Sequence, residues 1–194
     1  MKEVGLLGGA FDPPHCGHVA LARRALEHFA LGRLVVVVTG NPPHKPTETD
    51  ARTRFDLAAA AFEAIPNVEL NAHELEGEGP SYTVDTLRWA STLWEDLVFL
   101  VGADEFADFL SWRDPDGVLS YARLGVATRP GYPRERQEAV LAHLAEPDRV
   151  DFFEIPAIDV SSSDVREQVR RGDSIDGLVP PLVREQIESR GLYR

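Results

Sequence analysis

The chain has 194 residues, of which 43% are hydrophobic and 27% charged, a composition typical of a globular domain rather than a disordered segment. Its 20 basic and 32 acidic residues give a formal net charge of −12, which argues against a nucleic-acid partner but allows a small anion in a locally cationic cleft. A single cysteine excludes an internal disulfide, and no apolar run approaches the roughly 18 residues of a membrane span. We therefore predict one cytoplasmic domain over residues 1–194 with no membrane partner; the sequence does not specify its oligomeric state.

Short apolar runs alternate with helical patterns along the whole chain. In chain order, we expect a strand at 4–7, a helix at 17–30, a strand at 34–38, a helix at 53–65, a strand at 68–70, a helix at 83–94, a strand at 97–101, a short helix at 105–110, a strand at 124–127, a helix at 133–144, a strand at 150–155 and two helices at 162–171 and 181–190. The last two helices are each followed by glycine, a common helix stop.

This alternation predicts an α/β fold with a doubly wound, Rossmann-like parallel sheet, helices on both faces and a small helical C-terminal end. In such sheets, ligands bind beyond the carboxyl ends of the strands, where the strand order reverses. The segments that follow the predicted strands are therefore the places to look for a functional site.

The first strand is followed by Gly8-Gly-Ala-Phe-Asp-Pro-Pro-His-Cys-Gly-His18. His15 and His18 stand at a predicted helix start, where unpaired N–H groups and two imidazoles suit a phosphate. Two other interpretations stay open, namely a metal site that includes Asp12 and a Gly-Pro turn with incidental histidines. Cys16 beside a histidine is a weaker candidate for a nucleophile, because neighbouring side chains point in different directions.

Two later strand ends also carry cationic or hydroxyl groups. After the second strand, the proline-flanked segment 40–46 presents Lys45, although a solvent-exposed turn is the alternative interpretation. After the last strand, Ser161 and Asp164 have the spacing of a capping box, which explains those two residues without any function. It does not explain three consecutive serines or Arg166 one turn later, which together predict a second anion site.

The glycines do not match the common nucleotide-binding motifs. Residues 5–9 differ from the G-x-G-x-x-G fingerprint and the chain has no Gly-Lys pair, so a dinucleotide-dependent dehydrogenase and a P-loop ATPase are disfavoured. Trp112 follows a strand end and could stack on an aromatic ligand, although burial in the core is the commoner fate of tryptophan.

The paired segments 8–18 and 160–166 resemble the H-x-G-H nucleotidyltransferase superfamily. Within it, residues 42–45, 81–87, 101–104, 128–131 and 191–194 resemble the bacterial nicotinate-nucleotide adenylyltransferases, so the similarity covers nearly the whole chain. The resemblance implies transfer of AMP from ATP to nicotinate mononucleotide, with release of pyrophosphate and with Mg²⁺ bound through the ATP phosphates rather than by the protein.

The resemblance also implies roles for individual residues. The catalytic residues would be His15, His18, Lys45 and Arg166. The ATP-binding residues would be Gly8, Gly9, Phe11, Asp104, Ser162 and Ser163. Thr83, Trp112 and Arg113 would bind nicotinate mononucleotide. Ala10, where the family usually has a hydroxyl residue, and Arg113, where an aromatic residue is common, depart from the pattern.

The residue types fit this chemistry without the resemblance. The attacking group would be a phosphate oxygen that is already ionised, so cations and helix N-termini are needed but a general base is not. Two alternatives remain. One is a sister transferase whose acceptor is nicotinamide mononucleotide or phosphopantetheine, and the other is a non-catalytic nucleotide sensor on the same fold.

Overall fold

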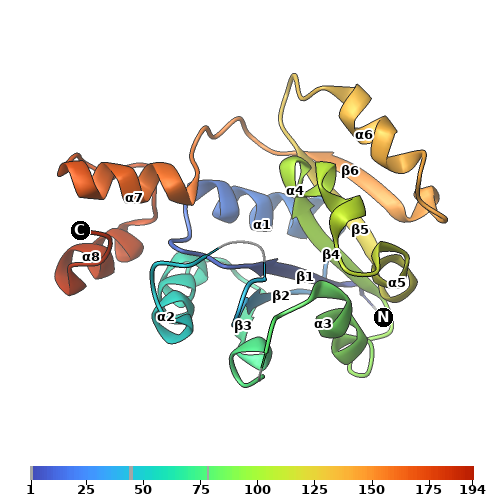
Figure 1. Cartoon of the computed structure of the whole chain (residues 1–194), viewed down its shortest axis with the longest axis horizontal. Helices are drawn as coiled ribbons and strands as arrows, with labels where there is room; N and C mark the ends of the chain where they lie inside the picture. Colours follow the sequence, from blue (N-terminus) through green and yellow to red (C-terminus); the bar gives the residue numbers. More distant parts are fainter. Residues whose placement is uncertain (1, 44–45, 78) are drawn as a thin grey trace.

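The structure is a computed structural model that describes residues 2–43, 46–77 and 79–194 (Figure 1). Its elements follow one another as β1 (Val4–Gly9), α1 (Cys16–His28), β2 (Arg33–Val38), α2 (Ala51–Phe62), β3 (Val68–Asn71), η1 (His73–Leu75), α3 (Thr83–Ala90), β4 (Leu97–Gly102), α4 (Ala103–Ala107), η2 (Phe109–Ser111), α5 (Pro115–Tyr121), β5 (Arg123–Thr128), α6 (Arg134–Leu141), η3 (Pro147–Arg149), β6 (Val150–Glu154), α7 (Ser162–Arg171) and α8 (Pro181–Arg190). The η elements are single 3₁₀ turns.

The six strands form one parallel sheet in the order β3-β2-β1-β4-β5-β6. Leu6 in the middle of β1 lies opposite Val35 of β2 on one side and Phe99 of β4 on the other. The chain runs outward from β1 to β3 and then returns to β4, so the strand order reverses between β1 and β4. A ligand site is therefore expected beyond the carboxyl ends of these two strands.

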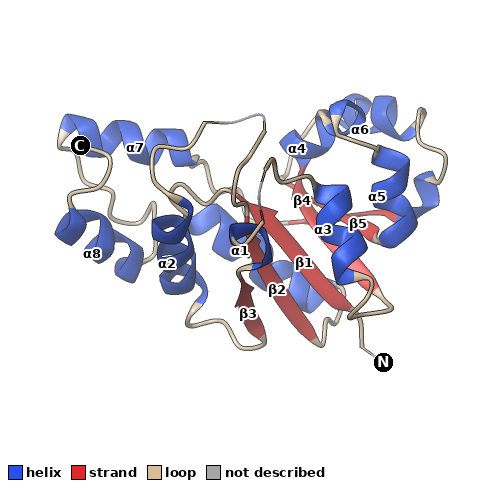
Figure 2. Cartoon of the chain, turned by 60° about the horizontal axis from the view of Figure 1, so that its bottom comes forward, coloured by secondary structure: helices blue, strands red, loops and turns tan. Residues whose placement is uncertain are grey.

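Side chains of alternate strand residues pack on opposite faces of the sheet, as the period of two requires. On β2, Leu34, Val36 and Val38 face the helices α1, α2, α7 and α8, whereas Val35 and Val37 face α3 to α6. Figure 2 shows α2, α7 and α8 gathered on one side and α3 to α6 on the other. The strands read as continuous apolar runs because both faces are buried.

The predicted α/β architecture, including the helical C-terminal end, is confirmed, with element ends shifted by a few residues. The expected helix over 83–94 ends earlier, at Ala90. Helix α5 was not predicted, because Asp114-Pro-Asp-Gly117 has the composition of a turn. In the structure Asp114 instead caps α5: its carboxylate accepts the N–H of Gly117, and Pro115 occupies the first turn.

Candidate active site

A cavity of about 690 Å³ opens beyond the carboxyl ends of β1 and β4, at the reversal of strand order. Segments far apart in the sequence line it, from the β1–α1 loop to the start of α7. The predicted site residues that line it are Gly8, Gly9, Phe11, His15, His18, Thr83, Asp104, Trp112, Ser162, Ser163 and Arg166. Lys45, also predicted for this site, lies outside the described residues.

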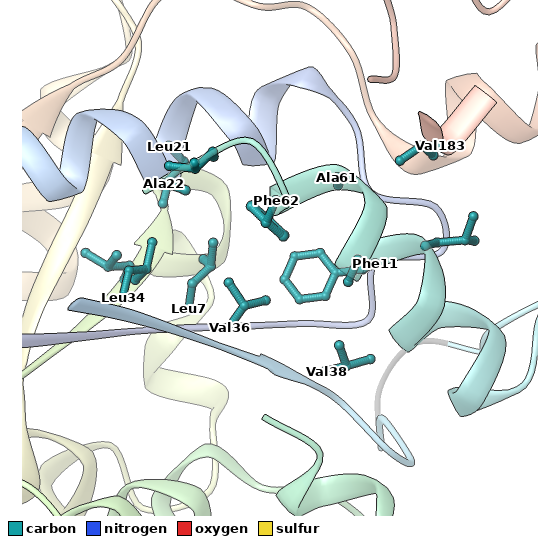
Figure 3. Packing of buried hydrophobic residues seen from close by; sticks show 14 of the residues in the cluster. Leu7, Phe11, Leu21, Ala22, Leu34, Val36, Val38, Ala61, Phe62 and Val183 are labelled. Atoms are coloured by element: carbon teal, nitrogen blue, oxygen red, sulfur yellow. The ribbon is translucent and has the colours of Figure 1, made fainter. Parts of the chain in front are cut away.

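The glycine pair at the end of β1 allows the following loop to fold back on the strand. A Cβ atom at Gly9 would lie 2.9 Å from the ring of Phe11, so a larger residue there would displace that ring. The Phe11 ring is 2% exposed and packs edge-on against Phe62 of α2 (Figure 3). It also packs edge-on against the ring of His18. Phe11 therefore shapes the cavity floor mainly as a core residue.

The two histidines meet at the N-terminus of α1. Their ring centroids are 3.8 Å apart, and the backbone N–H of His15 donates to Nδ1 of His18 at 3.1 Å. Because Nδ1 of His18 accepts this bond, the proton of the neutral ring resides on Nε2, which makes Nε2–H a hydrogen-bond donor.

Burial strongly affects the charge of His15. Burial lowers the pKa of His15 to about 4, and the negative charge of Asp164 offsets this only in part. The ring is therefore neutral at pH 7 before any ligand binds. His15 is thus a hydrogen-bonding group rather than a fixed cation at this site.

The N-terminus of α7 is fastened to the loop that follows β1. Ser161 and Asp164 form the expected capping box, with reciprocal bonds of 2.8 and 3.1 Å between backbone N–H groups and side-chain oxygens. The hydroxyl of Ser162 donates to the carbonyl oxygen of Pro13 at 2.8 Å. The N-termini of α1 and α7 therefore lie at the same cavity, as the two separate anion signals in the sequence predicted.

Arg166 connects three segments at the edge of the cavity. Its guanidinium donates to the carbonyl oxygen of Asp12 at 2.8 Å, to Oγ of Ser163 at 3.2 Å and to the carboxylate of Glu48 at 2.8 Å. Glu48 also binds Arg170, and the two arginines lower the pKa of its carboxyl. Glu48, which the sequence did not single out, therefore holds the guanidinium of Arg166 beside the β1–α1 loop.

The carboxylate of Asp12 is buried and fully engaged. It accepts hydrogen bonds from the backbone N–H of Glu48, the hydroxyl of Thr49 and the hydroxyl of Tyr193. Because both oxygens are occupied, Asp12 organises the loops, and the metal-ligand interpretation of Asp12 is disfavoured. Among the described residues, no group of three or more His, Cys, Asp or Glu side chains is arranged to hold a metal ion.

The opposite wall of the cavity carries the predicted acceptor residues. Trp112 packs edge-on against Phe109, with ring centroids 5.3 Å apart, and Thr83 begins α3. Arg113 is not among the lining residues: its guanidinium lies 4.5 Å from the ring of Tyr82 and 3.6 Å from the carboxylate of Asp85. The structure therefore does not bring Arg113 to the cavity.

Glu74 is a lining residue that the sequence did not reveal. It follows β3 in the turn η1, and its Oε1 accepts the hydroxyl of Thr86 at 2.6 Å. Burial raises the pKa of this carboxyl. On the far side of the cavity, Asp104 pairs with Arg129 at 3.1 Å. No local pattern marks either partnership, because each joins residues from different elements.

Comparisons with known proteins agree with this geometry. The cytidylyltransferase-like family model matches residues 6–168. A protein of Thermus thermophilus described as a probable nicotinate-nucleotide adenylyltransferase is 39% identical over 194 residues, 99% of this chain and 100% of the relative. The chain belongs to the nicotinate-nucleotide adenylyltransferase family. A second member, described in the same way, from Desulfitobacterium hafniense, is 38% identical over 199 residues, 100% of this chain and 96% of that protein.

Solved structures support the fold of this adenylyltransferase family. The nicotinic acid mononucleotide adenylyltransferase of Plasmodium falciparum, solved in complex with NaAD, has a TM-score of 0.79 at 19% identity, covering 100% of this chain and 98% of that one. The Rossmann-like fold and the family inferred from the sequence motifs are thus both confirmed. Within the described ranges, no helix combines the length and apolar character that crossing a membrane requires.

Proposed function

We propose that this protein transfers the AMP group of ATP to nicotinate mononucleotide, forming nicotinate adenine dinucleotide and pyrophosphate. One observation carries the proposal: the N-termini of α1 and α7, joined through Ser162 and Arg166, face a single cavity whose opposite wall holds Thr83 and Trp112. Two anion sites and an aromatic wall in one space suit a triphosphate and a mononucleotide.

In this reaction, a phosphate oxygen of the mononucleotide attacks the α-phosphorus of ATP. A new P–O bond forms while the bond between the α-phosphorus and the bridging oxygen breaks, and pyrophosphate leaves with that electron pair. The acceptor phosphate is already ionised, so no base is required. The residues must instead align the two phosphates and stabilise the negative charge on the equatorial oxygens.

We assign this task to His15, His18 and Arg166, with Lys45 assigned from the sequence alone. His18 donates from Nε2 and Arg166 supplies a fixed positive charge. A phosphate beside neutral His15 would favour its protonation, so that its positive charge would develop with the bound nucleotide. We further assign ATP contacts to the residues of the β1 turn, the α7 start and the β4 end, namely Gly8, Gly9, Phe11, Asp104, Ser162 and Ser163.

We propose Mg²⁺ as the cofactor, held by ATP phosphate oxygens and water. Three carboxylates at or near the cavity are engaged, since Asp12 accepts three hydrogen bonds while Asp104 and Glu48 pair with arginines. This arrangement suits a cation that arrives with the nucleotide. When bound, Mg²⁺ would neutralise phosphate charge. We also infer that residues 1–194 act as a single domain in the cytoplasm, because ATP and mononucleotides are present there.

The test is pyrophosphate release from ATP, Mg²⁺ and nicotinate mononucleotide, with reactions lacking the acceptor as the control. Nicotinamide mononucleotide and phosphopantetheine, supplied separately, test the sister transferases. Release with nicotinate mononucleotide supports the proposal. ATP binding without release for any acceptor would favour a nucleotide sensor, and release only with another acceptor would favour a sister transferase.

The acid-bearing substrate is expected to be preferred over the amide. Thr83 lies at the start of α3, where N–H groups and the positive end of the helix dipole favour a carboxylate. An amide NH₂ facing these donors would lose about 1–3 kcal/mol for each unpaired group. We therefore expect kcat/KM to favour nicotinate mononucleotide over nicotinamide mononucleotide by about 100-fold. Equal values for the two substrates would contradict this placement of the pyridine ring.

A further inference from the structure

Arg54, on the inward face of α2, is 1% exposed and is the largest fully buried side chain in the described chain. A buried arginine is unusual, because removing its charge from water is costly unless its donors are satisfied. Its guanidinium donates four hydrogen bonds to the residues that the structure describes, all of them to backbone carbonyl oxygens. Burial lowers the pKa of Arg54, with neighbouring carboxylates such as Asp12 partly opposing the effect.

The acceptors of these bonds lie in the loops that follow β1 and β2. Arg54 donates to Ala10 at 2.9 Å, to Gly40 at 2.9 Å, to Thr39, and to Thr49 at 3.3 Å. Ala10 belongs to the loop that carries His15, and the other three belong to the loop between β2 and α2. One side chain therefore ties together two loops that meet at the cavity.

Because the peptide group is planar, these bonds also fix the direction of the N–H group that follows each carbonyl. In a trans peptide the C=O and the following N–H point in opposite directions. Because the carbonyl of Ala10 points at Arg54, the N–H of Phe11 points away from it. The carbonyl of Gly40 also points at Arg54, and the N–H of Asn41 accordingly donates to Ser81 on the acceptor wall at 3.2 Å.

We propose that Arg54 is a positioning residue for the transfer reaction. It draws carbonyl oxygens at the ends of β1 and β2 away from the cavity, where they would repel phosphates, and it sets the spacing between the β1–α1 loop and the β2–α2 loop. This inference rests on the proposed function for its kinetic effect. Its effect on nucleotide binding does not depend on the identity of the acceptor.

Two variants separate the charge of Arg54 from its geometry. Arg54→Lys keeps a positive charge but cannot reach four carbonyls from a single ammonium nitrogen, whereas Arg54→Met removes both charge and donors. Leu57→Ala is the matched control, because Leu57 is also fully buried, lies one turn later on α2 and faces the same core. It removes core packing but none of the four hydrogen bonds to the loops, and it costs stability as a large-to-small core substitution does.

The measurements are ATP binding by calorimetry, kcat and KM for both substrates, and urea unfolding of each protein. Activity is measured under conditions in which the least stable variant remains folded. We expect Arg54→Lys to weaken ATP binding by about 10-fold and to lower kcat by about 100-fold, since small misplacements of reacting groups have effects of this size. We expect Leu57→Ala to stay within about 3-fold of the wild type in both quantities, although it unfolds at lower urea.

Several results would overturn the inference. The first is that Arg54→Lys folds and keeps both its ATP affinity and its kcat within about 3-fold of the wild type. The second is that Leu57→Ala loses as much activity as Arg54→Lys, because the loss would then be a general effect of a weakened core. If neither Arg54 variant folds while Leu57→Ala does, Arg54 is a folding residue and the inference is wrong. A wild type that binds ATP but releases no pyrophosphate would instead refute the proposed function, and the binding measurements would still decide the role of Arg54.

Discussion

Replacing Tyr193 with phenylalanine tests how the C-terminus supports the β1–α1 loop. Tyr193 is 6% exposed, and its hydroxyl donates to Oδ1 of Asp12 at 2.7 Å across 181 residues of sequence. Burial and the contact with Asp12 raise the pKa of the phenol, so the hydroxyl remains a donor at neutral pH. The variant removes this one bond and keeps the ring.

The magnitude follows from what the variant leaves behind. A hydrogen bond to a charged group contributes about 1.5–3 kcal/mol. Asp12 keeps its bonds to the N–H of Glu48 and the hydroxyl of Thr49, so its charge does not become unpaired. We therefore expect the lower part of that range, a loss of about 1.5–2 kcal/mol in the free energy of unfolding. Removing the ring as well, in Tyr193→Ala, should cost about 3–5 kcal/mol.

The assay is urea unfolding of Tyr193→Phe beside Tyr121→Phe, a matched loss of one tyrosine hydroxyl. Tyr121 accepts a bond of 3.2 Å from Arg88 at an exposed position, so its variant should change the free energy of unfolding by less than about 0.5 kcal/mol. The slope of the unfolding free energy against urea concentration should be the same in both variants as in the wild type, which would show that only stability changed. Equal losses in the two variants would refute the argument that the bond between Tyr193 and Asp12 stabilises the loop.

Three further predictions concern the cavity. His18→Ala and Arg166→Ala should each lower kcat by about 100-fold without unfolding the protein, measured by pyrophosphate release, and a fully active variant would remove its residue from the proposed catalytic set. Burial raises the pKa of the Cys16 thiol, which disfavours a thiolate, so Cys16→Ser should retain kcat within about 2-fold; a loss as large as that of His18→Ala would contradict this. Because the pKa of His15 is lowered from 6.5 to about 4, its stabilising effect is complete above pH 6.5 and is lost as the pH falls toward 4. Between pH 7 and 4.5, the wild type should lose about 2–3 kcal/mol more unfolding free energy than His15→Asn, and equal losses would show that His15 is not desolvated.

The sequence by itself determined the architecture and singled out the two segments proposed to bind anions. Continuous apolar runs such as 34–38 can only be strands buried on both faces, and their alternation with helical patterns requires a parallel sheet. The sequence also predicted where α7 begins, after its N-cap Ser161, since a capping box depends on two residues three positions apart. These features are local, so nearby residues are enough to specify them.

Tertiary structure decided how the local features combine into a site. The bond between Arg166 and the carbonyl of Asp12 joins residues 154 apart, and no spacing rule predicts such a contact. No spacing rule predicts the burial of Arg54 either, because on an isolated amphipathic helix it would be an ordinary surface residue. Arg113 shows the reverse case, because it follows Trp112 in sequence but turns away to Tyr82 and Asp85.

Burial also decided the charge of groups that the sequence singled out by position. His15 stands where the motif predicts a phosphate ligand, yet its ring is neutral because the surrounding core removes it from water. Charge state and side-chain direction depend on the solvent and neighbours that the folded chain supplies. The sequence therefore determined which residues reach the end of each strand, and packing determined which of them face the cavity and with what charge.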